Sequence, residues 1–299
     1  MRIEFPDLKN QEEITLYIIG NGFDLFHGID SKYEDFYYWL NVNKQKDFAR
    51  DFQNIFPKLN TNQDFLWSNF EEAMGDYDLN ELYKKFYVEP KDELDHIWAP
   101  NEWKKTAERI NIICKHLRPL MKKWAKKINI ENVKPELELS KDSWYLSFNY
   151  TTVLEDIYHI PSNHICHIHG CVNNNEDIIV GHERDVYIDN IHSNNFEEEH
   201  SKREIAKVMN GFVKHMDKQI ERNDSFFKLL KDVSHVVVLG HSLSKIDLIY
   251  FFRVLDQIQP RSNWHFSKHY GNEEKQLDVL LNHEKENKDR ITNYWIFNF

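Results

Sequence analysis

The pattern of apolar positions predicts a sheet that begins near the N-terminus. Residues Ile14–Ile19 form a short apolar run rich in β-branched side chains, which is typical of a buried parallel strand. Further runs of this kind are at residues 144–148, 165–168, 178–180, 235–239, 264–266 and 294–297. Helical patterns lie between most of them, at residues 151–159, 203–221, 226–232, 245–258 and 273–282. This alternation predicts a Rossmann-like α/β fold: a mostly parallel sheet with helices on both faces.

Between the first two strand patterns the period changes to that of helices. The clearest case is an apolar seam from Trp103 to Ile128 in alternating steps of four and three residues. Pro119 lies inside this seam, so we expect the helix to kink or split near Arg118. We interpret residues 1–299 as a single domain. Within it, residues 31–139 are a helical insertion after the first strand, and residues 14–30 with 140–299 are the Rossmann-like core. The polar stretch 173–200 is expected to be a surface loop.

Composition and charge exclude several classes of function. The 299 residues are 41% hydrophobic and 29% charged, as in globular proteins. The net charge of −11 disfavours generic nucleic-acid binding, which needs a basic surface. No apolar run approaches the roughly 20 residues that span a bilayer, and the N-terminus does not resemble a signal peptide. Three cysteines indicate a reducing compartment. We therefore expect a cytoplasmic protein without membrane contact.

Four polar motifs follow the expected strands. They are Gly20–Asp24, Ser147–Thr151, His167–Gly170 and Gly240–Ser244. Open α/β sheets bind ligands at the carboxyl ends of their strands. We therefore expect these four segments, although distant in sequence, to meet in one crevice that binds a small nucleotide.

The first two motifs have the residue types of a nucleotide pocket. Backbone N–H groups of Gly20, Asn21 and Gly22 are expected to face an anion, because glycine permits close backbone approach. Asp24 is expected either to bind a ribose hydroxyl or to cap the next helix. Asn149 can hold a ribose hydroxyl or a water, or it can close its own loop by bonding backbone. Thr151 or Thr152 is expected to cap the helix that follows, and Thr151 is also expected to line the nucleotide pocket.

The third motif offers imidazoles at a strand end. His169 precedes Gly170 and is a candidate general base, because the unperturbed pKa of histidine is about 6.5. A metal site would need His167 and His169 together with His182 or Cys171. An H-x-H pair without a third ligand at fixed spacing is common by chance, so we expect no metal.

The fourth motif admits two interpretations. Gly240, His241, Ser242 and Ser244, with Asp247, can line a nucleotide pocket. Alternatively, the apolar strand that leads into Gly-x-Ser resembles the nucleophile elbow of α/β-hydrolases, with Ser242 as the nucleophile. That alternative needs an acid and a histidine further along the chain, at Asp247, Asp256 or Asp278 and at His265, His269 or His283. On a helix of the insertion, Glu71 or Glu72 is a further candidate acid, although a solvated carboxylate is the ordinary state of such a residue.

Taken together, the motifs resemble those of the AbiH family of bacterial phage-defence proteins. The matching segments, in family order, are Ile18–Leu25 with His27-Gly28, Trp67-x-x-Phe-Glu71, Leu146–Thr152 with Leu154-Glu155, His167–Gly170, and Leu239–Ser244 with Asp247. The resemblance implies a function in abortive infection, in which an infected cell stops growing before the phage spreads.

A more distant similarity is to sirtuin-like domains, which carry a glycine loop, a strand-end Asn and a catalytic His before Gly in this order. The similarity implies an NAD pocket in which Asn149 matches the sirtuin-like Asn and His169 the catalytic His. Gly20 and Gly22 match the loop glycines. Because three cysteines cannot build a zinc ribbon, hydrolysis of NAD is the more natural activity than deacetylation.

Three hypotheses follow. In the first, the chain is an NAD glycohydrolase in which Asn149 and His169 act on the nicotinamide ribose and Asp24 or Glu72 stabilises its positive charge. In the second, it is a serine hydrolase built on Ser242. In the third, it is a nucleotide-binding sensor without turnover. Uncontrolled loss of NAD would kill the host, so the first hypothesis also needs a trigger, such as a phage protein or assembly into a homo-oligomer.

Overall fold

The chain forms two compact units, which are described separately below. The computed structural model describes residues 14–60, 70–88, 102–173 and 177–268, the helical positions 278, 280 and 282, and the backbone of 291–298. One unit, here called the sheet unit, comprises residues 1–32, 125–178 and 215–299. The other, the helical unit, comprises residues 33–124 and 179–214.

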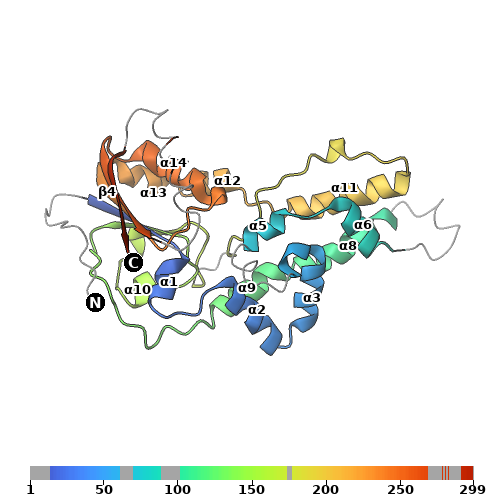
Figure 1. The fold of residues 1–299 in the computed structure, drawn as a ribbon, viewed down its shortest axis with the longest axis horizontal. Coiled ribbons are helices and arrows are strands. Elements are labelled where there is room, and N and C mark those ends of the chain that lie inside the picture. Colours follow the sequence, from blue (N-terminus) through green and yellow to red (C-terminus); the bar gives the residue numbers. More distant parts are fainter. Residues whose placement is uncertain are drawn as a thin grey trace. The chain divides into compact units, whose positions relative to one another are not determined.

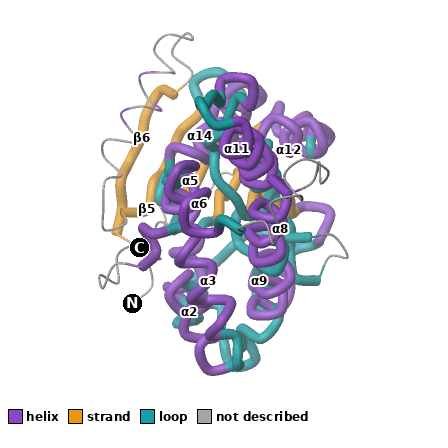
Figure 2. The backbone as a smooth tube through the Cα atoms, turned by 90° about the vertical axis from the view of Figure 1, so that its right-hand side faces the viewer, coloured by secondary structure: helices purple, strands orange, loops and turns teal. Residues whose placement is uncertain are grey.

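The sheet unit contains six parallel strands. They are β1 (Ile14–Ile19), β2 (Trp144–Ser147), β3 (Ile165–His167), β4 (Val233–Leu239), β5 (Ser262–Lys268) and β6 (Ile291–Asn298). Their order in the sheet is β3-β2-β1-β4-β5-β6, and Figure 2 shows β5 and β6 at one edge. This confirms the Rossmann-like fold. The direction of strand addition reverses between β1 and β4, which is where ligands bind in such sheets.

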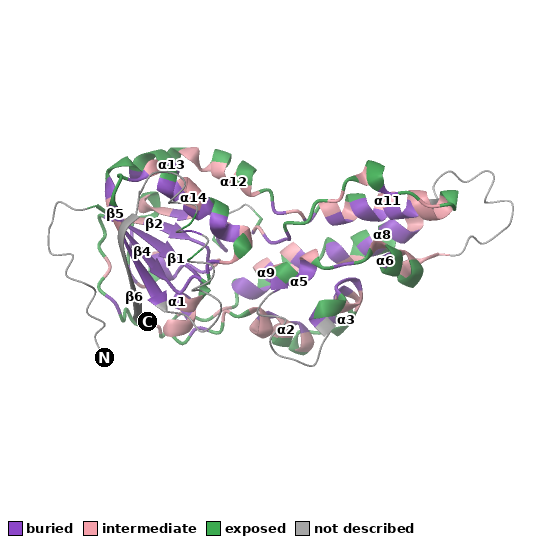
Figure 3. Cartoon of the chain, turned by 45° about the horizontal axis from the view of Figure 1, so that its top comes forward, coloured by how far each residue is buried: buried purple, intermediate pink, exposed green. Residues whose placement is uncertain are grey.

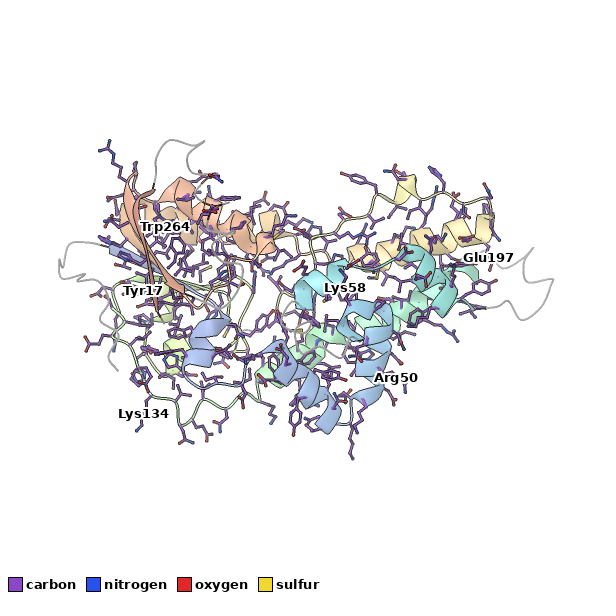
Figure 4. All side chains as sticks on the ribbon, viewed as in Figure 1. Tyr17, Arg50, Lys58, Lys134, Glu197 and Trp264 are labelled. Atoms are coloured by element: carbon purple, nitrogen blue, oxygen red, sulfur yellow. The ribbon has the colours of Figure 1, made fainter. Side chains whose placement is uncertain are left out.

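Helices cover both faces of the sheet (Figure 1). One face packs against α1 (Asn21–Phe26) and α10 (Val153–Asp156), and the other against α13 (Asp224–Leu229) and α14 (Leu248–Gln257). The strands between them are buried, as the purple colour of β1 and β4 in Figure 3 shows. Tyr17 and Trp264, labelled in Figure 4, illustrate the alternation: Tyr17 stacks on Tyr145 on the α1 side, and Trp264 is buried on the α14 side.

The helical unit is built mainly from the predicted insertion. Its helices are α2 (Tyr33–Val42), α3 (Lys46–Ile55), α5 (Phe70–Gly75), α6 (Leu79–Phe86), α8 (Glu102–Cys114), α9 (Leu117–Ala125) and α11 (Phe196–Asn210), with 3-10 turns at Pro57–Asn60 and Ile188–Asn190. The predicted seam is buried from Ala107 to Trp124. The predicted split is confirmed: α8 ends at Cys114, and Pro119 lies in the first turn of α9, where its missing N–H has no helical partner to lose.

Several predicted elements differ from the structure. Residues 178–180 form no strand. Ile178 and Val180 are buried, but they belong to an irregular segment. The pattern at 203–221 is two helices, α11 and α12 (Met216–Arg222), separated at Gly211. The helical pattern at 151–159 shortens to the four residues of α10. The pattern at 273–282 lies mostly outside the described residues.

The stretch 173–200 is not simply a surface loop. Its Glu run, Glu197–Glu199, is the first turn of α11, where carboxylates are favourable because a helix N-terminus is positive. Asn195 caps this helix by accepting hydrogen bonds from the N–H groups of Glu197 and Glu198. A search of the described helices finds none that could cross a bilayer.

Candidate active site

Asp24 is the buried centre of the first polar group at the carboxyl edge. Asp24 is a residue of α1, and it is only 1% exposed. Asn149 Nδ2 donates to Asp24 Oδ1 at 2.9 Å, and Thr151 Oγ1 donates to Asp24 Oδ2 at 2.7 Å. Burial raises the pKa of Asp24 to about 6, and the bonds from Thr151 and Asn149 only partly oppose this rise. The group joins the carboxyl ends of β1 and β2.

These contacts show which of the expected helix-capping roles are filled. Gly20, not Asp24, is the N-cap residue of α1. Thr151 bonds Asp24 instead of capping α10, and Thr152, the N-cap residue of α10, donates to Asp156 instead of to the helix backbone. Asn149 also donates from Nδ2 to the Gly20 carbonyl at 3.1 Å. Both N–H groups of the Asn149 carboxamide therefore bond within the protein. These two bonds do not use its Oδ1 atom.

The glycines of the β1 loop bring two loops into direct contact. The N–H of Gly20 donates to Leu239 O at 2.9 Å, and that of Gly22 donates to Gly240 O at 2.8 Å. A Cβ on Gly22 would lie 2.7 Å from Gly240 Cα, and a Cβ on Gly20 would lie 2.5 Å from the Cα of His241. These two N–H groups are therefore engaged by the β4 loop. The Asn21 side chain is exposed and accepts from Ser31 Oγ at 2.6 Å.

A second polar group is centred on Asp247. Its Oδ2 accepts from Ser244 Oγ at 3.0 Å and lies 3.7 Å from His241 Nε2, and its Oδ1 lies 3.6 Å from His169 Nε2. The N–H of Leu243 donates to His241 Nδ1 at 2.9 Å, so the neutral ring carries its proton on Nε2, towards the carboxylate. Asp247, His169 and His241 are all buried. Two imidazoles and a hydroxyl thus converge on one carboxylate.

The two groups lie on opposite sides of the end of β2. Phe148 and Asn149 are consecutive and point to opposite faces, as in a strand. The Asn149 carboxamide reaches α1 through Asp24. The His169 ring packs instead on Phe148, 5.0 Å between centroids, and on Tyr250 of α14 at 5.6 Å. The strand ends therefore meet at one edge, with Asn149 and His169 in separate groups.

His167 belongs to the α1 and α10 side. Its Nε2 lies 2.9 Å from Glu155 Oε1, and its Nδ1 lies 3.1 Å from the carbonyl oxygen of Asn149. Burial alone would lower the pKa of His167, but Cys171 and Glu155 outweigh it and raise that pKa to about 10. Glu155 has no role among the expected site residues, although it stands in the matching Leu154-Glu155 segment.

Ser242 is exposed on the β4 loop. In a nucleophile elbow the strained backbone carries the serine itself. Here the positive φ values are at Gly240 (63°) and Leu243 (51°), on either side of Ser242. His265 stacks on His235 within the sheet, and burial lowers its pKa to about 4. His269 and His283 lie outside the described residues.

The remaining candidates lie in the helical unit. Glu72 is exposed on α5. Its neighbour Glu71 bonds instead to Lys214 Nζ at 3.0 Å and accepts from the N–H of Gly181 at 3.4 Å. The ring of His182 is buried beside Tyr77 of the same unit. Trp67 lies outside the described residues.

Two cavities lie away from these groups. One, of about 490 Å³, is in the sheet unit; it is lined by Phe26, His27, Gly28, Asn129, Asn132, Val133, Lys134 and Glu136. The other, of about 290 Å³, is in the helical unit and includes Arg184 and Lys202 in its lining. Asn149 and His169 line neither of them.

The fold and the edge groups define an α/β protein of the Rossmann-like class, with acids and imidazoles gathered where such sheets bind ligands. A family model described as bacteriophage abortive infection AbiH matches residues 16–268, so the chain belongs to the AbiH family. This membership implies a function in abortive infection. Neither a curated protein nor a solved structure matches the chain.

Proposed function

We propose that the chain acts in abortive infection by hydrolysing NAD at the carboxyl edge of its sheet. The observation that carries the proposal is the convergence of His169 and His241 on the Asp247 carboxylate, beside the reversal between β1 and β4. The similarity to sirtuin-like domains supports NAD as the substrate.

In the proposed reaction, water attacks the anomeric carbon of the nicotinamide ribose. The water oxygen bonds to this carbon, the glycosidic bond breaks, and its electron pair leaves with nicotinamide. The proton of the water passes to His169, and Asp247 stabilises the imidazolium that forms. A positioned base of this kind raises the rate by a factor of roughly 10²–10⁴. The other product is ADP-ribose.

Asn149 is assigned to the ribose hydroxyl or the attacking water through Oδ1, because its Nδ2 is held by Asp24 and Gly20. Asp24 and Thr151 are then positioning residues that fix this carboxamide. Asn149 and His169 are buried on opposite sides of the end of β2, so a dinucleotide must lie across that end, and the edge must open, for it to contact both. Gly240, His241, Ser242 and Ser244 belong to the loop that would line the rest of the pocket.

The test uses cells that express the full chain and are infected with a phage that provokes growth arrest. We expect NAD to fall as growth stops in cells with the wild-type chain. We expect His169→Ala, Asn149→Ala and Asp247→Asn to keep NAD and to lose the arrest. His116→Ala is the matched control, because His116 is exposed between α8 and α9. Arrest with normal NAD in wild-type cells would overturn the proposal.

Two further results would point to the alternatives. Labelling of Ser242 by a fluorophosphonate probe would identify a serine hydrolase. Binding of NAD by the purified chain without turnover, even with the phage trigger present, would identify a sensor.

A further inference from the structure

We infer that Glu155, His167 and Cys171 bind one transition-metal ion of the zinc type. One ligand atom from each of these side chains, a carboxylate oxygen, an imidazole nitrogen and a thiol sulfur, lies within 4.8 Å of the other two. The site includes none of the residues assigned to the NAD reaction, although His167 contacts the backbone carbonyl of Asn149.

The second contact of His167 is the one that metal-binding histidines make. Its Nδ1 faces the carbonyl oxygen of Asn149 at 3.1 Å, so this nitrogen carries the proton and donates it. A metal ion would displace the proton that Nε2 shares with Glu155 at 2.9 Å, and the lone pair of the ring would then be on Nε2. A backbone carbonyl that fixes the tautomer in this way is the usual partner behind a metal-ligating imidazole.

Three local features bring the ligands together. His167 ends β3, and Glu155 projects from α10. Gly170 has a φ of 80°, and its N–H donates to His167 O at 3.0 Å, which makes a tight turn between the two ligands of this segment. That turn carries Cys171 back beside His167. The Gly170 turn of the third motif thus places Cys171.

The spacing suits a tetrahedral ion. Zinc bonds to nitrogen, oxygen and sulfur are about 2.0–2.3 Å, which places ligand atoms about 3.3–3.7 Å apart in a tetrahedron. The three atoms already lie within 4.8 Å of one another, so shifts of about 1 Å or less complete the site. Thiolate, imidazole and carboxylate together favour zinc over magnesium or calcium, which prefer oxygen ligands alone.

Burial is graded across the site. Cys171 is 2% exposed, whereas the Glu155 side chain is 22% exposed. Within the described residues, Glu155 Oε2 is a buried oxygen without a hydrogen-bond partner. An uncompensated buried carboxylate oxygen is costly, and a cation next to it removes that cost. Three protein ligands leave a fourth position for water.

The same three residue types can form a nucleophilic cysteine triad, but this geometry disfavours one. A triad histidine uses one ring nitrogen for the nucleophile and the other for the acid. Here Nδ1 is taken by the Asn149 carbonyl, and Cys171 is only 2% exposed. The metal set considered from sequence also differs, because His169 faces Asp247 and His182 belongs to the helical unit.

The experiment substitutes cobalt into the purified full-length chain. After removal of metals with a chelator and dialysis against Co²⁺, we expect one ion per chain by elemental analysis. We also expect a thiolate-to-cobalt charge-transfer band in the near ultraviolet. Cys171→Ser should remove the band, and Glu155→Gln should weaken Co²⁺ binding about tenfold or more. Cys166→Ser is the matched control, because Cys166 is also buried but its Sγ faces Asn223.

The outcomes separate clearly. Loss of the band in Cys171→Ser with its retention in Cys166→Ser supports the site. Failure of the wild-type chain to retain cobalt or zinc, or a band that survives in Cys171→Ser, overturns it. If Cys171→Ser does not fold by circular dichroism, Glu155→Gln decides, because this change keeps the shape of the side chain. Unchanged Co²⁺ affinity in that variant overturns the assignment. None of these readouts depends on hydrolysis of NAD.

Discussion

At the scale of single residues, the edge of the sheet is organised by short side chains around buried acids. Asp24 is enclosed by Asn149 and Thr151, and Asp247 by Ser244 and the imidazole of His169. A buried carboxylate retains its charge only when hydrogen bonds replace lost water. For Asp24 these bonds fall short of full compensation, since its pKa is raised to about 6.

Asp24 should therefore make stability depend on pH. Its pKa is about 6 in the folded chain, against the ordinary aspartate value of 3.8 in the unfolded chain, so the folded state holds the proton more tightly. The stabilising contribution of the Asp24 proton to the free energy of unfolding is complete below pH 3.8. This contribution is lost as the pH rises through 6. Between pH 4.5 and 7.5 the loss is about 2 kcal/mol. Asp24→Asn removes this term, so its stability relative to wild type should rise by about that amount over the same range.

Urea unfolding of both chains at the two pH values measures the effect. Taking the difference between the chains cancels the titration of groups that do not interact with Asp24. Asp30→Asn is a suitable control, because Asp30 is exposed near the same helix. A difference between wild type and Asp24→Asn that stays constant with pH would show that Asp24 ionises normally.

At the scale of elements, glycine sets how closely the β1 and β4 loops approach. Gly22→Ala would place a methyl group 2.7 Å from Gly240 Cα, which is backbone and cannot rotate away. Overpacking typically costs about 1–3 kcal/mol, and we expect this case at or above the upper end because the three nearest atoms are all backbone. Gly28→Ala is the control: the space around it is open within 4 Å, and its φ of 70° alone costs about 1–2 kcal/mol.

Thermal unfolding should therefore rank Gly22→Ala as less stable than Gly28→Ala. The same substitution should also disturb the Asp24 group, since Gly20 O accepts from Asn149 in the adjoining loop. Equal melting temperatures for the two variants would mean that the β1 and β4 loops can move apart without a loss of stability.

In the helical unit, Glu71 and Glu72 provide a matched pair on one helix. Glu71 neutralises Lys214, whose side chain is 0% exposed, whereas Glu72 faces solvent. Removing one partner of a buried ion pair costs about 3–5 kcal/mol, because it leaves the other charge uncompensated. We expect Glu71→Ala to be destabilised by about 3 kcal/mol and Glu72→Ala by less than about 0.5 kcal/mol.

Chemical denaturation of the two variants checks this expectation. The double variant Glu71→Ala, Lys214→Met should recover part of the loss, since it no longer buries an unpaired ammonium. A Glu72→Ala variant that loses as much stability as Glu71→Ala would contradict the assignment of the ion pair to Glu71.

The sequence allowed prediction of the elements whose signal is local. Apolar runs identified six strands, and Pro119 marked the break between α8 and α9. Residues 178–180 failed because a three-residue apolar run fits a strand and a buried loop equally well. The edge location of the four motifs followed from parallel topology. The hydrogen-bond and ion-pair partners of these residues could not be predicted from the topology. Each partner is set by contacts over long sequence separations, such as Asn149 with Asp24 and His169 with Asp247.

At the scale of the whole molecule, the helical unit is assembled from two separate segments, residues 33–124 and 179–214. The first corresponds to most of the predicted insertion. The second contributes α11, which packs against α6 and α8. The periodic pattern of α11 indicated a helix, but it did not show to which unit the helix belongs. The interpretation of residues 1–299 as one domain stays a prediction, and its test is the behaviour of chains that lack one segment or both.

We expect a chain in which a flexible linker replaces residues 33–124 to be poorly folded. Its α11 would lose α6 and α8, and the apolar face that they bury, Ile205, Ala206 and Met209, would be exposed to water. Replacing residues 179–214 as well removes that face and keeps all six strands. The doubly shortened chain should therefore be monodisperse and unfold in one thermal transition, whereas the singly shortened chain should aggregate and bind a hydrophobic dye. A singly shortened chain that is monomeric and binds no dye would mean that α11 does not need the helices of the first segment.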